Sequence, residues 1–109
     1  MAYDEGLAQR LRESLTGVSD LSEKKMFGGL AFLVAGNMCV GVMGEELIAR
    51  VGAAAYSSAV TLPGAHPFDF SSRPMAGWVM VRPEGFEDDV ALGDWIGRAL
   101  VFARSLPPK

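Results

Sequence analysis

Few residues in this sequence could carry nucleophilic or metal chemistry. His66 is the only histidine and Cys39 the only cysteine. A Ser–His or Cys–His pair would need His66, which stands in residues 64–67, a predicted surface loop with no motif around it. A metal site needs several ligands at a defined spacing, and one His and one Cys do not supply them. The sequence therefore predicts no catalytic residue, no cofactor and no metal site, and hence a protein that is not an enzyme.

Three other groups look like functional elements, and a structural role explains each of them better. Glu87–Asp89 lacks the alternating ligand spacing of a calcium loop and fits the start of a helix, where the dipole favours acidic side chains. Gly28–Gly29 matches neither phosphate-binding glycine pattern and indicates a bulge or a close approach of another part of the chain. Cys39 stands within a predicted strand, where a free cysteine behaves as a small buried hydrophobe.

One set of basic residues has aromatic residues nearby, as in proteins that stack and hold nucleic acid on a sheet. The candidate contacts are Lys24, Lys25, Arg50 and Arg73, with Phe27 and Trp78 as the aromatic residues. Solvated strand ends explain these bases equally well. The chain has 10 basic and 13 acidic residues, a net charge of −3 and a pI near 5.0, which opposes attraction to phosphate. Nucleic-acid contact is therefore the weaker expectation.

The elements that must position these residues follow from hydrophobic spacing and turn signals. Leu7, Leu11 and Leu15 recur every four residues and predict a helix over 4–16, and an apolar stripe predicts another over 88–105. Between them we expect a three-stranded meander, a short helix and further strands. The meander covers 24–51, with strands at 25–34, 38–43 and 46–51 and turns at Gly36–Asn37 and Gly44–Glu45; the helix covers 53–61, and the later strands lie near 67–70 and 75–82.

This order of elements predicts an α+β fold, a two-layer sandwich of a mostly antiparallel sheet and three helices. The 109 residues, half of them hydrophobic, are enough for one domain with its own core, which we place over 1–109. No stretch has the length of a membrane span or the pattern of a secretion signal, and a single cysteine suits a reducing compartment. We therefore expect a cytoplasmic protein without membrane contact.

The predicted strands are apolar on both faces, whereas a two-layer sandwich should leave one face polar. The first strand alternates between two apolar sets, and in the second Met38 and Val40 would share a face opposite Cys39. Either loops and chain ends cover the second face, or it is an interface with a protein partner or with a second copy in a homodimer.

Two segments carry a family resemblance. Residues 24–32 read Lys-Lys-Met-Phe-Gly-Gly-Leu-Ala-Phe, with Gly-Asn-Met following at 36–38, and residues 73–81 read Arg-Pro-Met-Ala-Gly-Trp-Val-Met-Val. Together they resemble the N-terminal domain of the TfoX/Sxy competence regulators, and the similarity extends over about residues 3–106. The shared motif positions, which are structural or interface-forming candidates, are Met26, Phe27, Gly28, Gly29, Gly36 and Trp78.

The resemblance implies a two-layer α/β domain and a link to bacterial transcriptional control. Full-length members help to switch on DNA-uptake genes, in some bacteria together with the cyclic-AMP receptor protein, and carry a second, C-terminal domain. We therefore expect a stand-alone, non-enzymatic regulatory domain that contacts a protein partner, such as the transcription machinery or a regulator. Two alternatives stay open. One is a weak nucleic-acid contact module, and the other is a small-ligand or enzymatic domain, which requires a pocket near Gly28 and Trp78.

Overall fold

The computed structural model describes residues 3–26, 28–70 and 73–108. The helices are α1 (Glu5–Ser14), α2 (Ala53–Ala59) and α3 (Asp89–Arg104), with a short 3-10 helix, η1, at Pro83–Gly85. The strands are β1 (Leu21–Met26), β2 (Gly29–Val34), β3 (Asn37–Met43), β4 (Glu46–Arg50), β5 (Ala65–Phe70) and β6 (Arg73–Val81). Within the described residues, no helix is long and apolar enough to cross a membrane.

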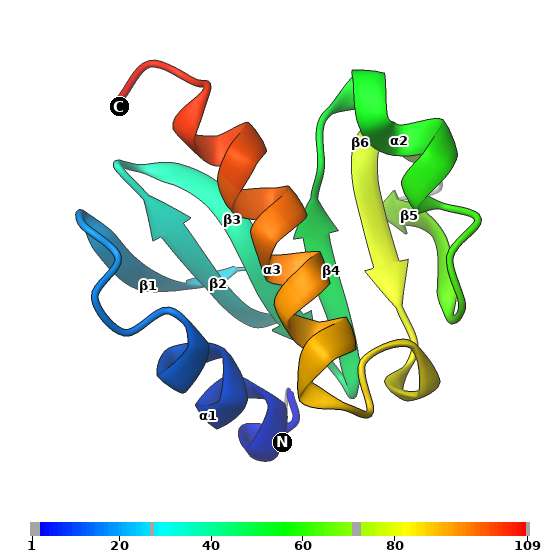
Figure 1. The fold of residues 1–109 in the computed structure, drawn as a ribbon, viewed down its shortest axis with the longest axis horizontal. Coiled ribbons are helices and arrows are strands. Elements are labelled where there is room, and N and C mark those ends of the chain that lie inside the picture. The colour runs from blue at the N-terminus through cyan, green and yellow to red at the C-terminus, as the bar shows by residue number, and fades with distance from the viewer. Residues whose placement is uncertain (1–2, 27, 71–72, 109) are drawn as a thin grey trace.

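The strands form one antiparallel sheet in the order β1-β2-β3-β4-β6-β5. Helices α1 and α3 lie across one face of this sheet, with α2 beside β6 (Figure 1). The α+β fold expected from the sequence is confirmed. So are the three helices, whose observed limits fall within the predicted ones.

Acidic caps explain where the two longer helices begin. The Asp4 carboxylate accepts a hydrogen bond from the Gly6 backbone N–H at 2.8 Å. The Asp88 carboxylate does the same for the Ala91 N–H at 2.7 Å. Each cap satisfies a backbone donor that has no partner within the helix and places negative charge at the positive end of its dipole. The acidic group at 87–89 therefore has the structural role that its position predicted.

The meander has one strand more than expected. The segment predicted as a single strand over 25–34 is the β1–β2 hairpin, in which Met26 pairs with Gly29. Gly28 lies between them with φ of +76°, a left-handed conformation that glycine adopts without steric cost. The two adjacent glycines thus belong to different structures, because Gly28 makes the turn and Gly29 begins β2.

The β2–β3 turn is shifted by one residue from its predicted place. Ala35 and Gly36 both have positive φ, 52° and 83°, as a two-residue hairpin turn requires. Asn37 is instead the first residue of β3, and its buried side chain donates a hydrogen bond to the Pro107 carbonyl at 2.9 Å. Asn37 therefore fixes the chain after α3 against the sheet.

A β-bulge changes the faces of β3. Phe32 pairs with Val40 and Leu33 pairs with Met38, so Cys39 is the extra residue. The prediction that Met38 and Val40 share a face was wrong. Val40 and Cys39 both lie in the cluster beneath the helices, and Met38 lies in a different cluster.

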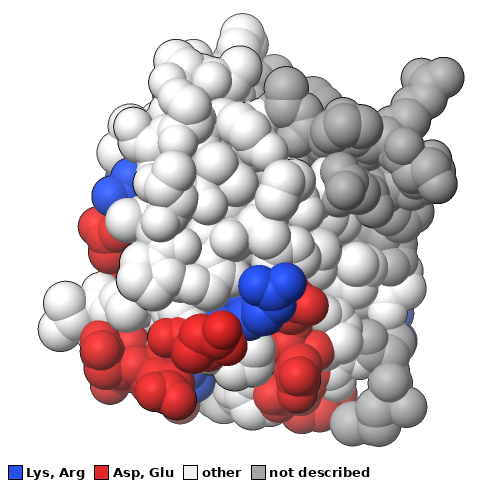
Figure 2. All heavy atoms as spheres, turned by 90° about the vertical axis from the view of Figure 1, so that its right-hand side faces the viewer, with Lys and Arg blue, Asp and Glu red and all other residues white. Residues whose placement is uncertain are grey.

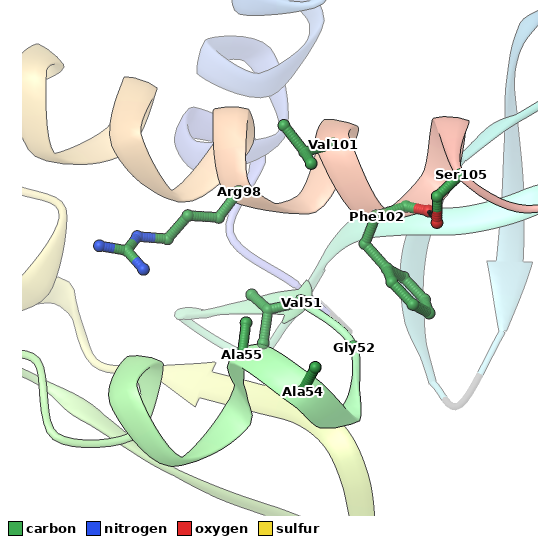
Figure 3. Close-up of a pocket in the computed structure, with 8 residues that line it drawn as sticks. All are labelled: Val51, Gly52, Ala54, Ala55, Arg98, Val101, Phe102 and Ser105. Carbon is green, nitrogen blue, oxygen red and sulfur yellow. Dashed lines mark hydrogen bonds between the residues drawn. The ribbon is translucent and has the colours of Figure 1, made fainter.

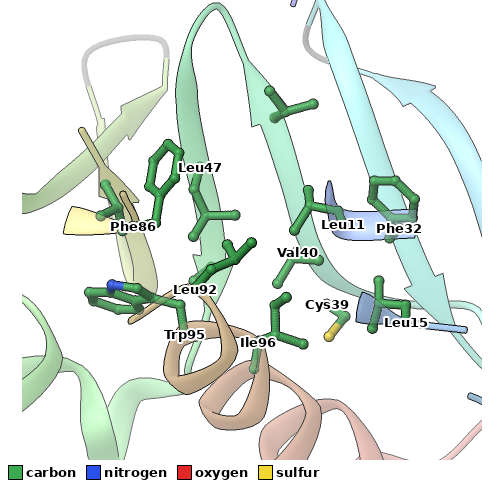
Figure 4. Packing of buried hydrophobic residues seen from close by; sticks show 14 of the residues in the cluster. Leu11, Leu15, Phe32, Cys39, Val40, Leu47, Phe86, Leu92, Trp95 and Ile96 are labelled. Atoms are coloured by element: carbon green, nitrogen blue, oxygen red, sulfur yellow. The ribbon is translucent and has the colours of Figure 1, made fainter. Parts of the chain in front are cut away.

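The two clusters occupy opposite faces of the sheet. The larger joins strand side chains to α1 and α3, with Leu11, Trp95 and Ile96 from the helices packed on residues such as Leu47 and Phe32 (Figure 4). The smaller contains only strand residues among those described. We call it the strand-only face; its buried members are Ala31, Met38, Ile48, Phe68 and Met80, with Met26, Leu33, Met43 and Trp78 half-buried around them.

Candidate functional site: a basic and apolar pocket on the sheet

A pocket of about 440 Å³ opens on the strand-only face. Its lining, which we call the sheet pocket, consists of Lys24, Met26, Leu33, Gly36, Met38, Arg50 and Trp78. Five of these seven residues were candidates from the sequence, although they come from four separate stretches of the chain. Antiparallel pairing brings these stretches together, because β1, β2 and β3 are neighbours and Arg50 of β4 pairs with Trp78 of β6.

The remaining candidates do not line this pocket. Lys25 is exposed on β1 and lies two residues after Glu23, so both side chains are on the same face of the strand. Glu23 forms an ion pair with Arg12 of α1 at 2.8 Å. Side chains alternate along a strand, so Lys25 faces the helix side, whereas Lys24 faces the pocket. Arg73 begins β6, and its side chain lies outside the described part. Phe27 lies outside the described residues altogether.

The two adjacent glycines are also absent from the pocket lining. Gly28 is exposed in its turn. Gly29 is buried, and a Cβ atom built on it would collide with the backbone carbonyl oxygen of Val42. The close approach predicted from the sequence is therefore confirmed at Gly29. The pocket near Trp78 exists, and it lies beside Met26 rather than beneath the glycines.

Arg50 is the most constrained cation of the sheet pocket. Its Cζ atom lies 5.1 Å from the ring centroid of Trp78 and 5.2 Å from that of Phe102 in α3. Both distances are within the range of cation–π attraction. Trp78 also contacts Phe68, with 6.0 Å between ring centroids. The guanidinium thus contacts two aromatic rings, one from the sheet and one from the helix layer.

Close backbone contacts at two glycines, Gly52 and Gly77, position Arg50 beside the rings of Trp78 and Phe102. Gly77 has φ of +87°, and its carbonyl accepts hydrogen bonds from Val51 and Gly52 at 2.8 and 3.1 Å. Gly52 has φ of +88°, and a Cβ there would meet the Phe102 ring, with Cε1 at 2.6 Å. Small residues at both positions let β6 and α3 approach the end of β4, where Arg50 lies.

Sequence reasoning missed three residues of this arrangement. Leu33 and Met38 were seen only as apolar strand positions, and Phe102 only as part of the helix stripe. No local signal distinguishes them, because their roles depend on strand pairing, on the bulge and on the crossing of α3 over β4.

A second hollow, the helix groove, lies between α2 and α3 and measures about 360 Å³ (Figure 3). It is lined by Val51, Gly52, Ala54, Ala55, Arg98, Val101, Phe102 and Ser105. Its charged group already has a partner, because Arg98 forms an ion pair with Asp94 at 2.9 Å. The groove therefore offers mainly apolar surface, with Val101 74% exposed at its rim.

The only histidine and the only cysteine lie apart from each other. His66 is in β5, not in a surface loop as predicted, and its Nε2 lies 2.5 Å from the Glu46 carboxylate. Cys39 is fully buried under the helices, as expected, and burial raises the pKa of its thiol to about 12. A thiol with that pKa is protonated at neutral pH and is a poor nucleophile. No group of three or more metal-ligating side chains occurs in the described part of the chain.

Many acidic side chains lie together on the face that Figure 2 shows. Most of them lie along its lower edge, at the end where α3 begins. Arg50 contacts Phe102 near the other end of that helix.

Comparison with known proteins assigns the family. The family model described as TfoX N-terminal domain matches residues 13–103. The chain belongs to the TfoX N-terminal domain family. No curated protein and no solved structure matches the chain.

Every residue of the sheet pocket lies inside the region that matches the TfoX N-terminal domain. Both segments that carried the resemblance contribute to its lining, with Lys24 and Met26 from the first and Trp78 from the second. The resemblance expected from the sequence is confirmed, and the structure adds that its motifs meet at one surface.

Proposed function

We propose that this TfoX N-terminal domain is a non-enzymatic regulatory domain that acts on transcription by contacting another protein through its strand-only face. The observation that carries the proposal is the sheet pocket, a hollow that combines an apolar floor with Lys24 and Arg50. Pockets with a mainly apolar lining and a few polar groups are typical binding sites. The family supports a regulatory role as the context of that binding.

The places of the two best candidates for nucleophilic chemistry support a binding role for the sheet pocket. The Cys39 thiol is buried and its pKa is raised, and His66 of β5 pairs with Glu46 of β4. Neither residue belongs to the sheet pocket. A binding function requires only the shape and charge that this pocket has.

Site-specific photocrosslinking in the cells of origin tests the proposal. A photoreactive amino acid at Leu33 samples the sheet pocket, and the same amino acid at Val101 samples the helix groove. We expect a discrete crosslinked protein from position 33 that is absent from position 101, and altered transcript levels in a Trp78→Ala strain. A partner crosslinked from position 101 alone, or unchanged transcripts with Trp78→Ala, would contradict the proposal.

A weak nucleic-acid contact remains the second candidate function, because Lys24, Arg50 and Trp78 share one pocket. The net charge of −3 and the engagement of the Trp78 ring by Arg50 favour the protein contact. Electrostatic binding to nucleic acid falls steeply with salt, so absence of a shift with single-stranded DNA at low ionic strength would eliminate this candidate.

A further inference from the structure

Arg50 differs from the other half-buried arginines in its electrostatic partners. Arg10, Arg12 and Arg98 each form an ion pair with an aspartate or glutamate. Arg50 is equally half-buried, yet among the side chains that the structure describes neither Arg50 nor Lys24 forms an ion pair. A partly desolvated guanidinium loses hydration that the aromatic rings replace only in part. The sheet pocket therefore contains positive charge that no described carboxylate pairs with.

The rings of Trp78 and Phe102 restrict how this charge can be used. They contact the flat guanidinium at 5.1 and 5.2 Å from their centroids. Among the described residues the Arg50 guanidinium donates no hydrogen bond, so its N–H groups are available as donors. Such a planar donor set matches a carboxylate, which can accept two parallel hydrogen bonds. The ring contacts restrict the Arg50 side chain before binding, which lowers the entropy lost when the anion is bound.

The rest of the sheet pocket is suited to an apolar side chain. Met26, Leu33 and Met38 line its wall, and the volume of about 440 Å³ leaves space beyond a single carboxylate. Methionine side chains adapt their shape to different apolar groups. A ligand that fits therefore has a carboxylate near an apolar group, as an acidic segment of a protein does.

We infer that the sheet pocket binds an acidic segment of a partner protein, with Arg50 paired to a carboxylate of that segment and an apolar side chain of the segment packed against Met26, Leu33 and Met38. This inference rests on the proposed function, since it names the chemistry of the partner that the strand-only face contacts. Lys24, exposed at the rim on β1, adds attraction for neighbouring acidic residues of the segment.

Other occupants fit the pocket less well. Base stacking needs a free aromatic face, but Arg50 covers Trp78 from one side and Phe68 contacts the same ring. A nucleic-acid backbone also needs a track of several cations, and Lys25 faces the helix side. A symmetric dimer with its twofold axis at the pocket would bring Lys24 and Arg50 toward their own copies, which is repulsive.

The two tryptophans allow a direct test in the full chain. Trp78 lines the sheet pocket, whereas Trp95 is buried beneath α3, so their indole N–H signals in an NMR spectrum report on the two faces separately. The probes are short capped peptides with aspartates and glutamates around one central apolar residue. Matched peptides carry asparagine and glutamine in place of the acidic residues, and a single-stranded oligonucleotide and free acetate serve as further probes.

We expect the acidic peptides to shift the Trp78 signal and to leave the Trp95 signal in place. The neutral peptides should bind at least about tenfold more weakly, and Arg50→Gln should cause a similar loss, as for other charge-assisted contacts. Arg82→Gln is the matched control, because Arg82 is exposed and lies outside the sheet pocket. Equal binding of acidic and neutral peptides, a stronger response to the oligonucleotide or to acetate, or no Trp78 shift at millimolar peptide would overturn the inference.

The same variants separate this inference from the proposed function. If the crosslinked partner at position 33 persists unchanged in Arg50→Gln, the face contacts a protein but does not recognise its acidic residues. If no partner crosslinks, the proposed function fails as well. Sedimentation of the wild-type chain that shows a dimer lost in Arg50→Gln would identify a second copy as the occupant and would also overturn the inference.

Discussion

The two faces of the sheet are both apolar, yet they differ in what covers them. One face meets α1 and α3, and its side chains interlock with those of the helices. The strand-only face has no helix residue in its cluster among the residues described, and its buried members pack against one another. Its half-buried residues surround a pocket that contains two cations. The first face therefore supplies stability, and the second has the composition of a binding surface.

This difference shows that the pattern of apolar residues along a strand does not tell a core face from a binding face. Both sets of strand residues satisfy the rule that hydrophobic side chains avoid water. The strand-only face also has a pocket lined by both apolar residues and two cations, Lys24 and Arg50, for which no ion pair is described. Arg50 connects the two faces, because it contacts Trp78 on the strand-only side and Phe102 of α3.

The largest loss of stability is expected at Gly29, because the pairing of β2 with β3 supports both faces of the sheet. In Gly29→Ala the new Cβ meets the Val42 carbonyl oxygen, and neither backbone can move without disturbing the β2–β3 pairing. We expect a loss of about 3 kcal/mol or more in the free energy of unfolding, measured by urea denaturation. Gly93→Ala is the control, since nothing lies within 4 Å of its added Cβ in α3 and its stability should rise by up to about 1 kcal/mol. Equal midpoints for the two variants would refute the close contact.

Truncating one leucine on each face tests the comparison directly. Leu11 of α1 is fully buried beneath the helices, and Leu11→Ala should lower the free energy of unfolding by about 3 kcal/mol. Leu33 is half-buried in the sheet pocket, so Leu33→Ala should cost about 1 kcal/mol because it removes less buried surface. A larger loss for Leu33→Ala in thermal or urea unfolding would show that the strand-only face is a second stabilising core.

The contact between Gly52 and α3 can be tested with two glycines that have nearly equal φ. Gly17 and Gly52 have φ of +89° and +88°, but only Gly52 has a neighbour, the Phe102 ring, where a Cβ would stand. Each change to alanine should cost about 1 kcal/mol for the positive φ. Gly52→Ala should cost more, because its ψ of 153° lies in a region almost exclusive to glycine and because displacing the ring costs about 1 kcal/mol. A double-mutant cycle of Gly52→Ala with Phe102→Ala should recover the part that is due to the ring; a coupling energy of zero would contradict the ring contact.

The smallest effect concerns Cys39 and depends on pH. Burial raises the pKa of the folded thiol from 9.0 to about 12, so the unfolded chain loses this proton first as the pH rises. The contribution to stability is complete below pH 9 and is lost between about pH 9 and 12, with a slope of up to about 1.4 kcal/mol per pH unit. Denaturation across this range should show a steeper decline for wild type than for Cys39→Ala. Parallel slopes, or rapid alkylation of the native thiol at pH 8, would contradict the burial.

Local signals predicted much of the fold. The spacing of Leu7, Leu11 and Leu15 and the acidic residues before 89 located two helices within a few residues of their observed limits. The β1–β2 hairpin was missed because two adjacent glycines can equally occupy a strand or a turn. The bulge at Cys39 was missed because an extra residue in a strand is defined only by the partner strand.

The sequence named five of the seven residues that line the sheet pocket, but it did not show that they lie together. By itself the sequence determined the fold class, the helices and the supply of basic and aromatic residues, because periodicity, capping and composition are properties of short stretches of chain. Only the tertiary structure decided that Lys24 and not Lys25 faces the sheet pocket, that Met38 and Val40 lie on opposite faces, and that Phe102 supports Arg50. These outcomes depend on strand register and on the crossing of a helix over a strand, and such contacts join residues that local spacing cannot relate.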